Sequence, residues 1–129
     1  MRPESSKELS ELSVQGLAHV GDAVFELMVR TWLCLTGTST AKKLHDRAVS
    51  FVSAKAQAAV ADRILSELDE EEINIYKRGR NTHLNSIPKG STHEEYHSAT
   101  GIEVLFGYLY ISGKTDRLNE LFSLIVEDN

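Results

Sequence analysis

The chain has 129 residues, of which 41% are hydrophobic and 26% are charged, a composition typical of a globular domain that excludes wholesale disorder. Fourteen lysines and arginines against 19 aspartates and glutamates give a net charge of −5, so any binding of nucleic acid must rely on a local basic patch. No apolar run exceeds four residues, far below the roughly 18 needed to cross a bilayer, and the single cysteine excludes an internal disulfide.

This length predicts one domain over residues 1–129, large enough to bury most of its apolar surface. The polar start of the chain lacks the apolar stretch behind a basic cluster that a secretory signal requires. We therefore expect a cytoplasmic protein with no contact with a membrane.

Apolar residues recur every three or four positions along most of the chain, which predicts an all-α fold. The first predicted helix covers residues 13–35 and ends before Gly37. Its apolar stripe is expected to contain Leu17, Val20, Val24, Leu27 or Met28, Thr31 and Leu35. Two more helices are predicted over residues 44–51 and 53–68, with Ser53 as the N-cap of the second.

Asp69 opens the next helix, and Glu72 three residues later completes a pattern typical of a capping box. Residues 79–93 show no apolar period, and such a long loop is usually functional or disordered. The last two helices are predicted over residues 94–112 and 115–126.

Two acids on separate predicted helices are the candidates for chemistry. Asp22 follows Gly21 inside the first helix, where a glycine costs about 1 kcal/mol relative to alanine. Gly21 and Ala18 leave space for a second helix, and Glu103 shares a helical face with Gly107. If these faces cross, the two carboxylates suit a hard cation such as Mg²⁺, which takes further ligands from water and phosphate. The alternative is that both acids are solvated surface side chains.

Several motifs resemble one known family. The stretch Leu17–Glu26 resembles the signature helix of the ribonuclease III family, in which a Leu-Glu-x-Leu-Gly-Asp motif carries metal-binding acids. Ala18 stands in place of the glutamate, and Thr100 replaces the aspartate of an Asp-x-x-Glu motif that ends here at Glu103. These departures make the chain similar to the Mini-III ribonucleases, a compact branch, as do three further segments, Ser53–Gln57, Tyr76–Asn81 and Gly107–Tyr110.

The resemblance implies the all-α helical bundle of a ribonuclease III endonuclease domain, dimeric and without a separate double-stranded-RNA-binding domain. It implies a homodimeric endoribonuclease that depends on Mg²⁺, with Mn²⁺ as a substitute, and cleaves double-stranded RNA. Asp22 and Glu103 would be its catalytic and metal-binding residues. Maturation of ribosomal RNA, particularly the 23S RNA of the large subunit, is the family's usual task. Because half of the usual four acids are absent, we expect one weakly held ion, with a second brought in by RNA.

A basic segment could hold the RNA. Residues 77–89 contain four lysines or arginines and no acid. Duplex RNA is recognised through its shape, phosphates and 2′-hydroxyls, and cations on the protein release its counterions. We expect contacts from Lys77, Arg78, Arg80, Asn81, Thr82, His83 and Lys89, with Asn85 as a further candidate. Lys77 and Arg78 could instead stabilise a helix C-terminus. Lys42 and Lys43 could form a second basic contact at the mouth of a dimer groove, and we rank them below this segment.

The remaining candidates have simpler interpretations. Glu26 could be a third carboxylate, although pairing with an arginine is at least as good an explanation. His19 could suggest a zinc ligand or a general base, as could His93 and His97, which lie four residues apart. A convincing third zinc ligand is missing. A helix cap and a solvated helix face explain His93 and His97 more simply. Core packing is expected for Trp32, Phe106 and Phe122, and helical packing for Tyr76, Tyr108 and Tyr110.

Two functions from other classes remain open. Ala18 and Thr100 in place of acids would fit a dimeric protein that binds duplex RNA without cleaving it. A helical interaction module unrelated to RNA is the third interpretation. Duplex binding and Mg²⁺-stimulated cleavage separate the three.

Overall fold

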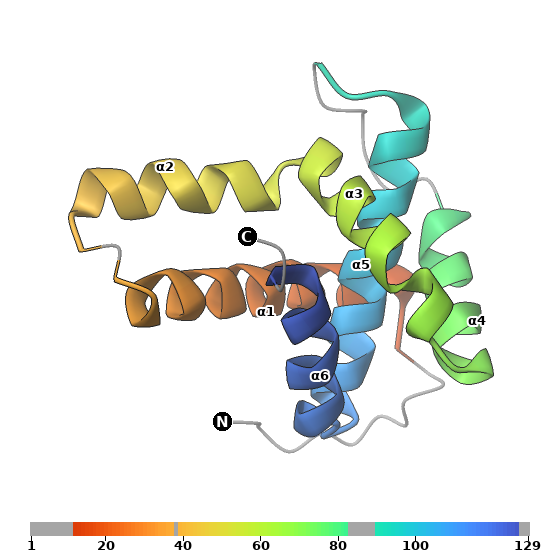
Figure 1. Cartoon of the computed structure of the whole chain (residues 1–129). Helices are drawn as coiled ribbons and strands as arrows, with labels where there is room; N and C mark the ends of the chain where they lie inside the picture. Colours follow the sequence, from red (N-terminus) through yellow and green to blue (C-terminus); the bar gives the residue numbers. More distant parts are fainter. Residues whose placement is uncertain (1–11, 38, 83–89, 127–129) are drawn as a thin grey trace.

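The computed structural model describes residues 12–37, 39–82 and 90–126, and Figure 1 shows their arrangement. Within these ranges the chain is helical and contains no strand, which confirms the all-α prediction. The elements are α1 (Val14–Leu35), α2 (Ala41–Val52), α3 (Ala54–Ile64), the 3₁₀ turn η2 (Leu65–Glu67), α4 (Glu70–Arg80), α5 (His93–Ile111) and α6 (Thr115–Val126). None of these helices combines the length and the apolar character that crossing a membrane requires.

α5 lies at the centre of the fold. It packs against α1, α3, α4 and α6, and buried residues occur around its whole circumference, as expected of a helix enclosed by neighbours. Phe25 of α1 and Phe106 of α5 are fully buried and meet edge to face, with ring centroids 5.5 Å apart. Phe122 of α6 extends this cluster at 6.4 Å from Phe25. The core therefore holds α1 and α6 against the central helix, and both phenylalanines assigned to the core are confirmed.

α1 begins where expected, because the Ser13 side chain accepts a hydrogen bond of 2.9 Å from the backbone of Gly16. The expected apolar stripe is confirmed only in part, because Leu17 is buried and Val24 and Met28 pack half-buried against the core. Leu27 and Leu35 are 65% and 80% exposed. The buried row instead runs at intervals of four residues through Leu17, Gly21, Phe25, Val29 and Leu33. A glycine offers no apolar side chain to a pattern search, so the row that passes through it was missed.

Most boundary differences come from side-chain caps. α2 begins at Ala41, three residues earlier than expected, because Thr40 accepts a hydrogen bond of 3.3 Å from the backbone of Lys43. A capping box between Thr92 and Glu95 starts α5 at His93. α4 has the expected box between Asp69 and Glu72 and continues to Arg80, so the expected loop begins later than residue 79.

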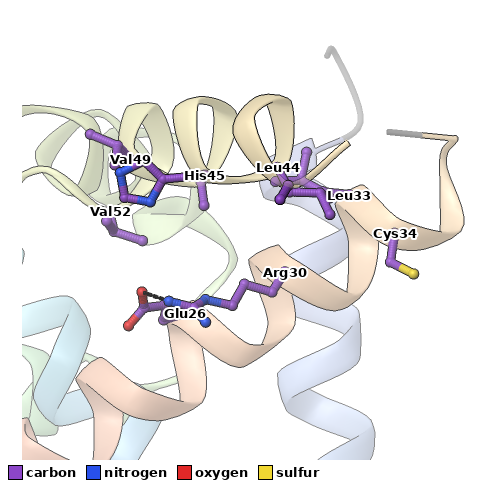
Figure 2. Close-up of a pocket in the computed structure, with 10 residues that line it drawn as sticks. Glu26, Arg30, Leu33, Cys34, Leu44, His45, Val49 and Val52 are labelled. Carbon is purple, nitrogen blue, oxygen red and sulfur yellow. Dashed lines mark hydrogen bonds and ion pairs between the residues drawn. The ribbon is translucent and has the colours of Figure 1, made fainter. Parts of the chain in front are cut away.

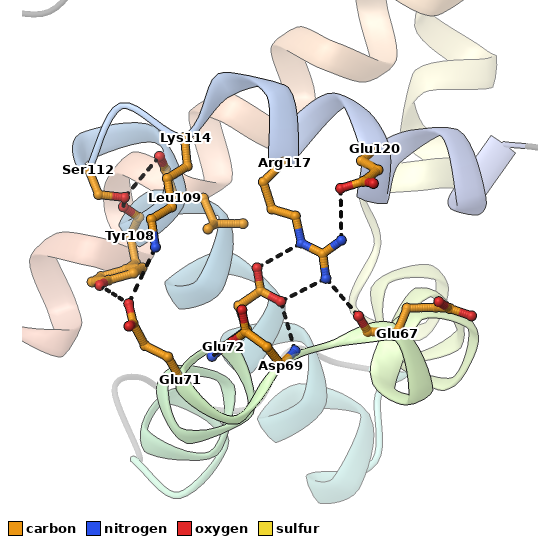
Figure 3. A network of polar contacts seen from close by, with 10 residues as sticks. All are labelled: Glu67, Asp69, Glu71, Glu72, Tyr108, Leu109, Ser112, Lys114, Arg117 and Glu120. Atoms are coloured by element: carbon orange, nitrogen blue, oxygen red, sulfur yellow. Dashed lines mark hydrogen bonds and ion pairs between the residues drawn. The ribbon is translucent and has the colours of Figure 1, made fainter.

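An arginine fastens α6 to the start of α4 (Figure 3). Arg117 donates to both carboxylate oxygens of Glu72 at 2.8 Å and to the carbonyl of Glu67 at 2.6 Å. Glu72 is only 3% exposed, and the hydrogen bonds from Arg117 lower its pKa. Beside it, Tyr108 donates to Glu71, which also pairs with Lys114. The acidic start of α4 therefore has the structural role expected of it.

Candidate active site

The candidate site lies where α1 crosses α5, and two glycines permit the crossing. A methyl group at Gly21 would lie 1.6 Å from the carbonyl oxygen of Glu103, and one at Gly107 would lie 2.0 Å from the carbonyl oxygen of Leu17. The two helix backbones are thus in direct contact, which side chains larger than hydrogen would prevent. This contact compensates for the cost of Gly21 inside a helix and fixes the separation of the acids on either side.

The crossing brings the carboxyl groups of Asp22 and Glu103 together. Both residues line one cavity, where Asp22 is exposed and Glu103 is half-buried. Burial, followed by the negative charge of Asp22, raises the pKa of Glu103 from 4.5 to about 8. Glu103 therefore holds its proton more strongly than an isolated glutamate does, and a cation bound at the pair would oppose this effect.

A cavity of about 240 Å³ opens beside the pair, between α1 and α5. Ala18 and Thr100 line it, and both are buried. The Thr100 hydroxyl donates to the carbonyl of Tyr96 at 3.0 Å, one turn back along its own helix. Short side chains at these two positions leave space next to the carboxyl groups for water, a cation or a phosphate.

The donor set fits a hard divalent cation with few protein ligands. Two adjacent carboxylates repel each other when both are ionised, and Mg²⁺ relieves that repulsion while keeping several waters. Within the described ranges no group of three or more histidines, cysteines, aspartates and glutamates converges on one point. Glu26 is engaged elsewhere, because it accepts from Arg30 at 2.7 Å.

Three residues that line the cavity were not assigned to the site by sequence reasoning: Gln15, His19 and Tyr96. Their spacing could have revealed them. Gln15 and His19 lie seven and three residues before Asp22, and Tyr96 and Thr100 lie seven and three before Glu103. Residues at these intervals share a helical face, so each acid forms one end of a stripe along its helix.

The basic residues expected to contact RNA lie at the end of α4, which packs beside α5. Lys77 and Arg78 are exposed. Arg78 donates to the carbonyl of Leu12 at 3.3 Å and so also holds the segment before α1. Arg80 is half-buried, with its guanidinium 6.0 Å from the ring centre of Tyr76. Of these three cations, Arg78 contacts a segment outside α4, and Lys77 is exposed to solvent.

The rest of that segment is described only in part. Asn81 is exposed and caps the C-terminus of α4. The Thr82 hydroxyl donates to the carbonyl of Arg78 at 2.7 Å, which ties it to the helix end. His83, Asn85 and Lys89 lie outside the described residues.

The aromatic interpretations are largely as expected, whereas the structure corrects those of the two histidines on α5. Tyr76 is buried, and Tyr108 and Tyr110 are half-buried against the core. Trp32 is half-buried and packs on Phe51, so it lies at the edge of the core rather than within it. The cap of α5 is Thr92, not His93. The solvated face expected for His97 is wrong, because its half-buried ring packs against the ring of Tyr96 at 5.3 Å.

Known proteins that are similar to this chain come from one family. A family model for the ribonuclease III domain matches residues 15–114. A Mini-ribonuclease 3 from Clostridium tetani is 37% identical over 95% of this chain and 82% of its own length. One from Thermoanaerobacter sp. is 43% identical over 90% of this chain and 82% of its own length.

A solved structure supports the same assignment. The crystal structure of a Fusobacterium nucleatum protein is 30% identical and superposes with a TM-score of 0.84, covering 95% of this chain and 98% of that one. The matched range contains both acids of the crossing and both glycines that permit it. The chain therefore belongs to the ribonuclease III family of endoribonucleases and, within it, to the Mini-III branch.

Proposed function

We propose that the protein cleaves double-stranded RNA in a reaction that depends on Mg²⁺, with Asp22 and Glu103 as the residues that hold the cation. The observation that carries the proposal is that both carboxyl groups line one open cavity at the helix crossing, near enough for the charge of Asp22 to raise the pKa of Glu103. Mg²⁺ bound there would supply a Lewis acid for the phosphate and an activated water, and Mn²⁺ has a similar preference for oxygen ligands. Two protein ligands suggest weak binding in the absence of RNA.

The chain's own residues prepare the site for this reaction. The Gly21–Gly107 crossing fixes the separation of the carboxyl groups without relying on a flexible loop. Glu103, deprotonated, supplies negative charge from a partly buried position where water screens it poorly. Ala18 and Thr100 add no charge, so the cavity accepts an anionic phosphate more readily than a pocket with four acids.

The end of α4 supports binding of a duplex. Lys77, Arg78 and Arg80 lie in the last turns of a helix that packs against α5 at Gly101 and Val104, close in sequence to Glu103. Cations there would contact phosphates, and Asn81 and Thr82 could contact 2′-hydroxyls. His83 and Lys89 belong to the same proposal on sequence grounds alone.

A homodimer is part of the proposal. Leu27, Leu35 and Val49 are the large apolar side chains most exposed in the described part of the chain, and all three lie on α1 and α2. Leu27 and Leu35 share one side of α1, next to the exposed Ala23. An apolar surface of this kind marks an association site, and two copies would provide one cut for each RNA strand. Sedimentation should give a dimer, and Leu27→Glu should give a monomer; a monomeric wild-type protein would contradict this.

The natural substrate we propose is precursor ribosomal RNA, specifically 23S RNA of the large subunit, processed in the cytoplasm. This part of the proposal is supported by the family resemblance of the sequence motifs. Mapping of cleavage sites on precursor ribosomal RNA tests it. Cuts confined to the base-paired ends of the 23S precursor are expected, and cutting of other duplexes in preference would contradict it.

Cleavage of a long RNA duplex by variants that remove one charge but keep the side-chain shape tests the chemistry. Asp22→Asn and Glu103→Gln should each abolish Mg²⁺-dependent cleavage while circular dichroism shows an intact fold. Glu26→Gln is the control, because Glu26 is an acid one turn beyond Asp22 that pairs with Arg30 instead. Full activity in Asp22→Asn would refute the assignment. Duplex binding by the wild type without any cleavage would favour the second candidate, a non-catalytic RNA-binding dimer, which the loss of acids at Ala18 and Thr100 suggests.

A further inference from the structure

Two of the cavities that border α1 differ in the chemistry of their walls. The larger, a groove of about 370 Å³ between α1 and α2, is lined mainly by apolar side chains such as Leu33 and Val52 (Figure 2). Its charged pair, Glu26 and Arg30, has no net charge. The smaller cavity, beside the carboxyl pair, is lined by polar side chains apart from Ala18. The smaller cavity is therefore the one whose walls can form hydrogen bonds with a polar ligand.

A phosphate group bound in the smaller cavity needs hydrogen-bond donors from the protein. The carboxyl groups of Asp22 and Glu103 only accept hydrogen bonds when they are ionised, and their charge repels an anion unless a cation lies between them. A cation offsets the charge of the phosphate oxygen that it binds and leaves the other oxygens without a partner. Among the described residues that line the cavity, none is a lysine or an arginine. The donors must therefore come from the other polar side chains.

Four side chains in this cavity carry donors, and two of them are available to a ligand. The Thr100 hydroxyl already donates to the carbonyl of Tyr96, and Tyr96 is only 8% exposed. Gln15 and His19 complete the set, and both are exposed. Within the described part of the chain, the side chains of Gln15 and His19 form no hydrogen bond or ion pair. A ligand in the cavity can therefore use their donors without breaking a contact of the protein.

The position along α1 favours His19 over Gln15. His19 lies three residues before Asp22, so the two side chains are neighbours on one face of the helix, with Cβ atoms about 5–6 Å apart. Gln15 lies seven residues before Asp22, which is about 10 Å along the helix axis. A phosphate that contacts a cation at Asp22 is therefore closer to His19. An imidazole ring has an N–H donor whether it is neutral or protonated, so this contact does not depend on its charge.

We propose that His19 is a further catalytic residue of this site, and that its ring N–H donates a hydrogen bond to a non-bridging oxygen of the phosphate that is cleaved. The inference rests on the proposed cleavage of double-stranded RNA, and it assigns to that reaction a phosphate contact that the carboxyl pair cannot make. Negative charge grows on the non-bridging oxygens as water adds to the phosphorus. A donor held in place by a helix therefore stabilises the transition state more than the bound substrate.

Single-turnover cleavage of an RNA duplex by the full-length protein with Mg²⁺ tests this role. His19→Leu, which removes the donor, should slow cleavage about 100-fold. Its affinity for the duplex without divalent cation and its Tm should match those of the wild type, because His19 is exposed and makes one contact among many. His19→Gln, which keeps an N–H donor, should recover most of the rate. His45→Leu is the matched control, because His45 is also an exposed helical histidine but lines the groove of Figure 2 instead.

Sulfur in place of one non-bridging oxygen identifies the contact itself. Sulfur accepts hydrogen bonds weakly. A duplex with a phosphorothioate at a mapped cleavage position, in the configuration that replaces the oxygen bound by His19, should therefore be cut about 10-fold more slowly by the wild type. His19→Leu should cut this duplex and the unmodified one at equal rates, because its hydrogen bond is already absent. In the opposite configuration, which replaces the other oxygen, any effect of sulfur should be the same in both proteins.

The outcomes are distinguishable. Slow cleavage by His19→Leu that is insensitive to sulfur in one configuration, with duplex binding unchanged, supports the contact. Cleavage by His19→Leu at the wild-type rate overturns it and leaves the cleavage proposal intact, as does a sulfur effect in His19→Leu equal to that of the wild type in both configurations. Loss of duplex affinity as large as the loss of rate also overturns it, because His19 would then bind RNA without favouring the transition state. A wild-type protein that cleaves no duplex refutes both proposals.

Discussion

Replacing Gly21 with alanine should disturb both stability and catalysis, because the new methyl group would meet backbone. It would lie 1.6 Å from the carbonyl oxygen of Glu103 and 2.8 Å from the backbone nitrogen of Gly107, whereas ordinary contacts begin near 3.4 Å. α1 and α5 would therefore have to separate by about 2 Å, a form of overpacking that costs about 1–3 kcal/mol. Alanine recovers about 1 kcal/mol of helix propensity. Because backbone atoms cannot rotate away, the cost lies at the upper end of that range, about 3 kcal/mol, and the expected net loss is about 2 kcal/mol.

Thermal unfolding and single-turnover cleavage measure the two effects. A loss of this size should lower Tm by about 8 °C in a chain of this length. Displacement of the carboxyl pair by an ångström or more should slow cleavage by about 100-fold even at temperatures where the variant is folded. Gly16→Ala is the control, since its methyl group would meet only the Ser13 hydroxyl at 3.0 Å. Unchanged Tm and activity in Gly21→Ala would refute the helix contact.

Three further outcomes follow from the structure. Because the pKa of Glu103 is raised, its contribution to the stability of the cation-free protein is full below pH 4.5 and is lost as the pH rises toward 8. The affinity for Mg²⁺ should rise over the same pH range, because the cation competes with the proton. Thermal unfolding and titration calorimetry measure the two effects, and a profile that does not change with pH would contradict them. Arg117→Met should lower the free energy of unfolding by about 3 kcal/mol, because it leaves the carboxylate of Glu72 buried without its arginine partner. In urea unfolding, the double variant with Glu72→Gln should recover most of this loss. Losses from the two substitutions that simply add together would contradict the pairing. Phe25→Ala should cost about 3–5 kcal/mol by the same measurement, because its ring is fully buried against Phe106, and a loss under 1 kcal/mol would contradict this packing.

The fold was predictable where interactions between residues close in the sequence determine the structure. The capping box at Asp69 and Glu72 depends on residues three apart, and the structure forms it as expected. The buried row of α1 was not predictable in the same way, because Gly21 belongs to it only through its contact with α5. Leu27 and Leu35 show the converse, since they are apolar but exposed in the single chain. Periodicity identifies a helix, but it does not say which of two apolar rows a neighbour will cover.

The candidate site was predictable in outline. Asp22 and Glu103 could be selected because each has a small residue near it, which is the local mark of a close helix crossing. Nothing in the sequence gives the depth of burial that raises the pKa of Glu103, because the other helix supplies it. The groove between α1 and α2 was equally hidden, since it depends on how far α2 stands from α1.

The central claim is that Asp22 and Glu103 jointly hold the divalent cation used for RNA cleavage. Crystals grown with Mn²⁺, measured at a wavelength where manganese scatters anomalously, locate that cation directly. The account predicts an anomalous peak within coordination distance of oxygens from both carboxylates, and its loss in Asp22→Asn. A peak elsewhere, or a cation bound with full occupancy by the Asp22→Asn protein, would contradict it.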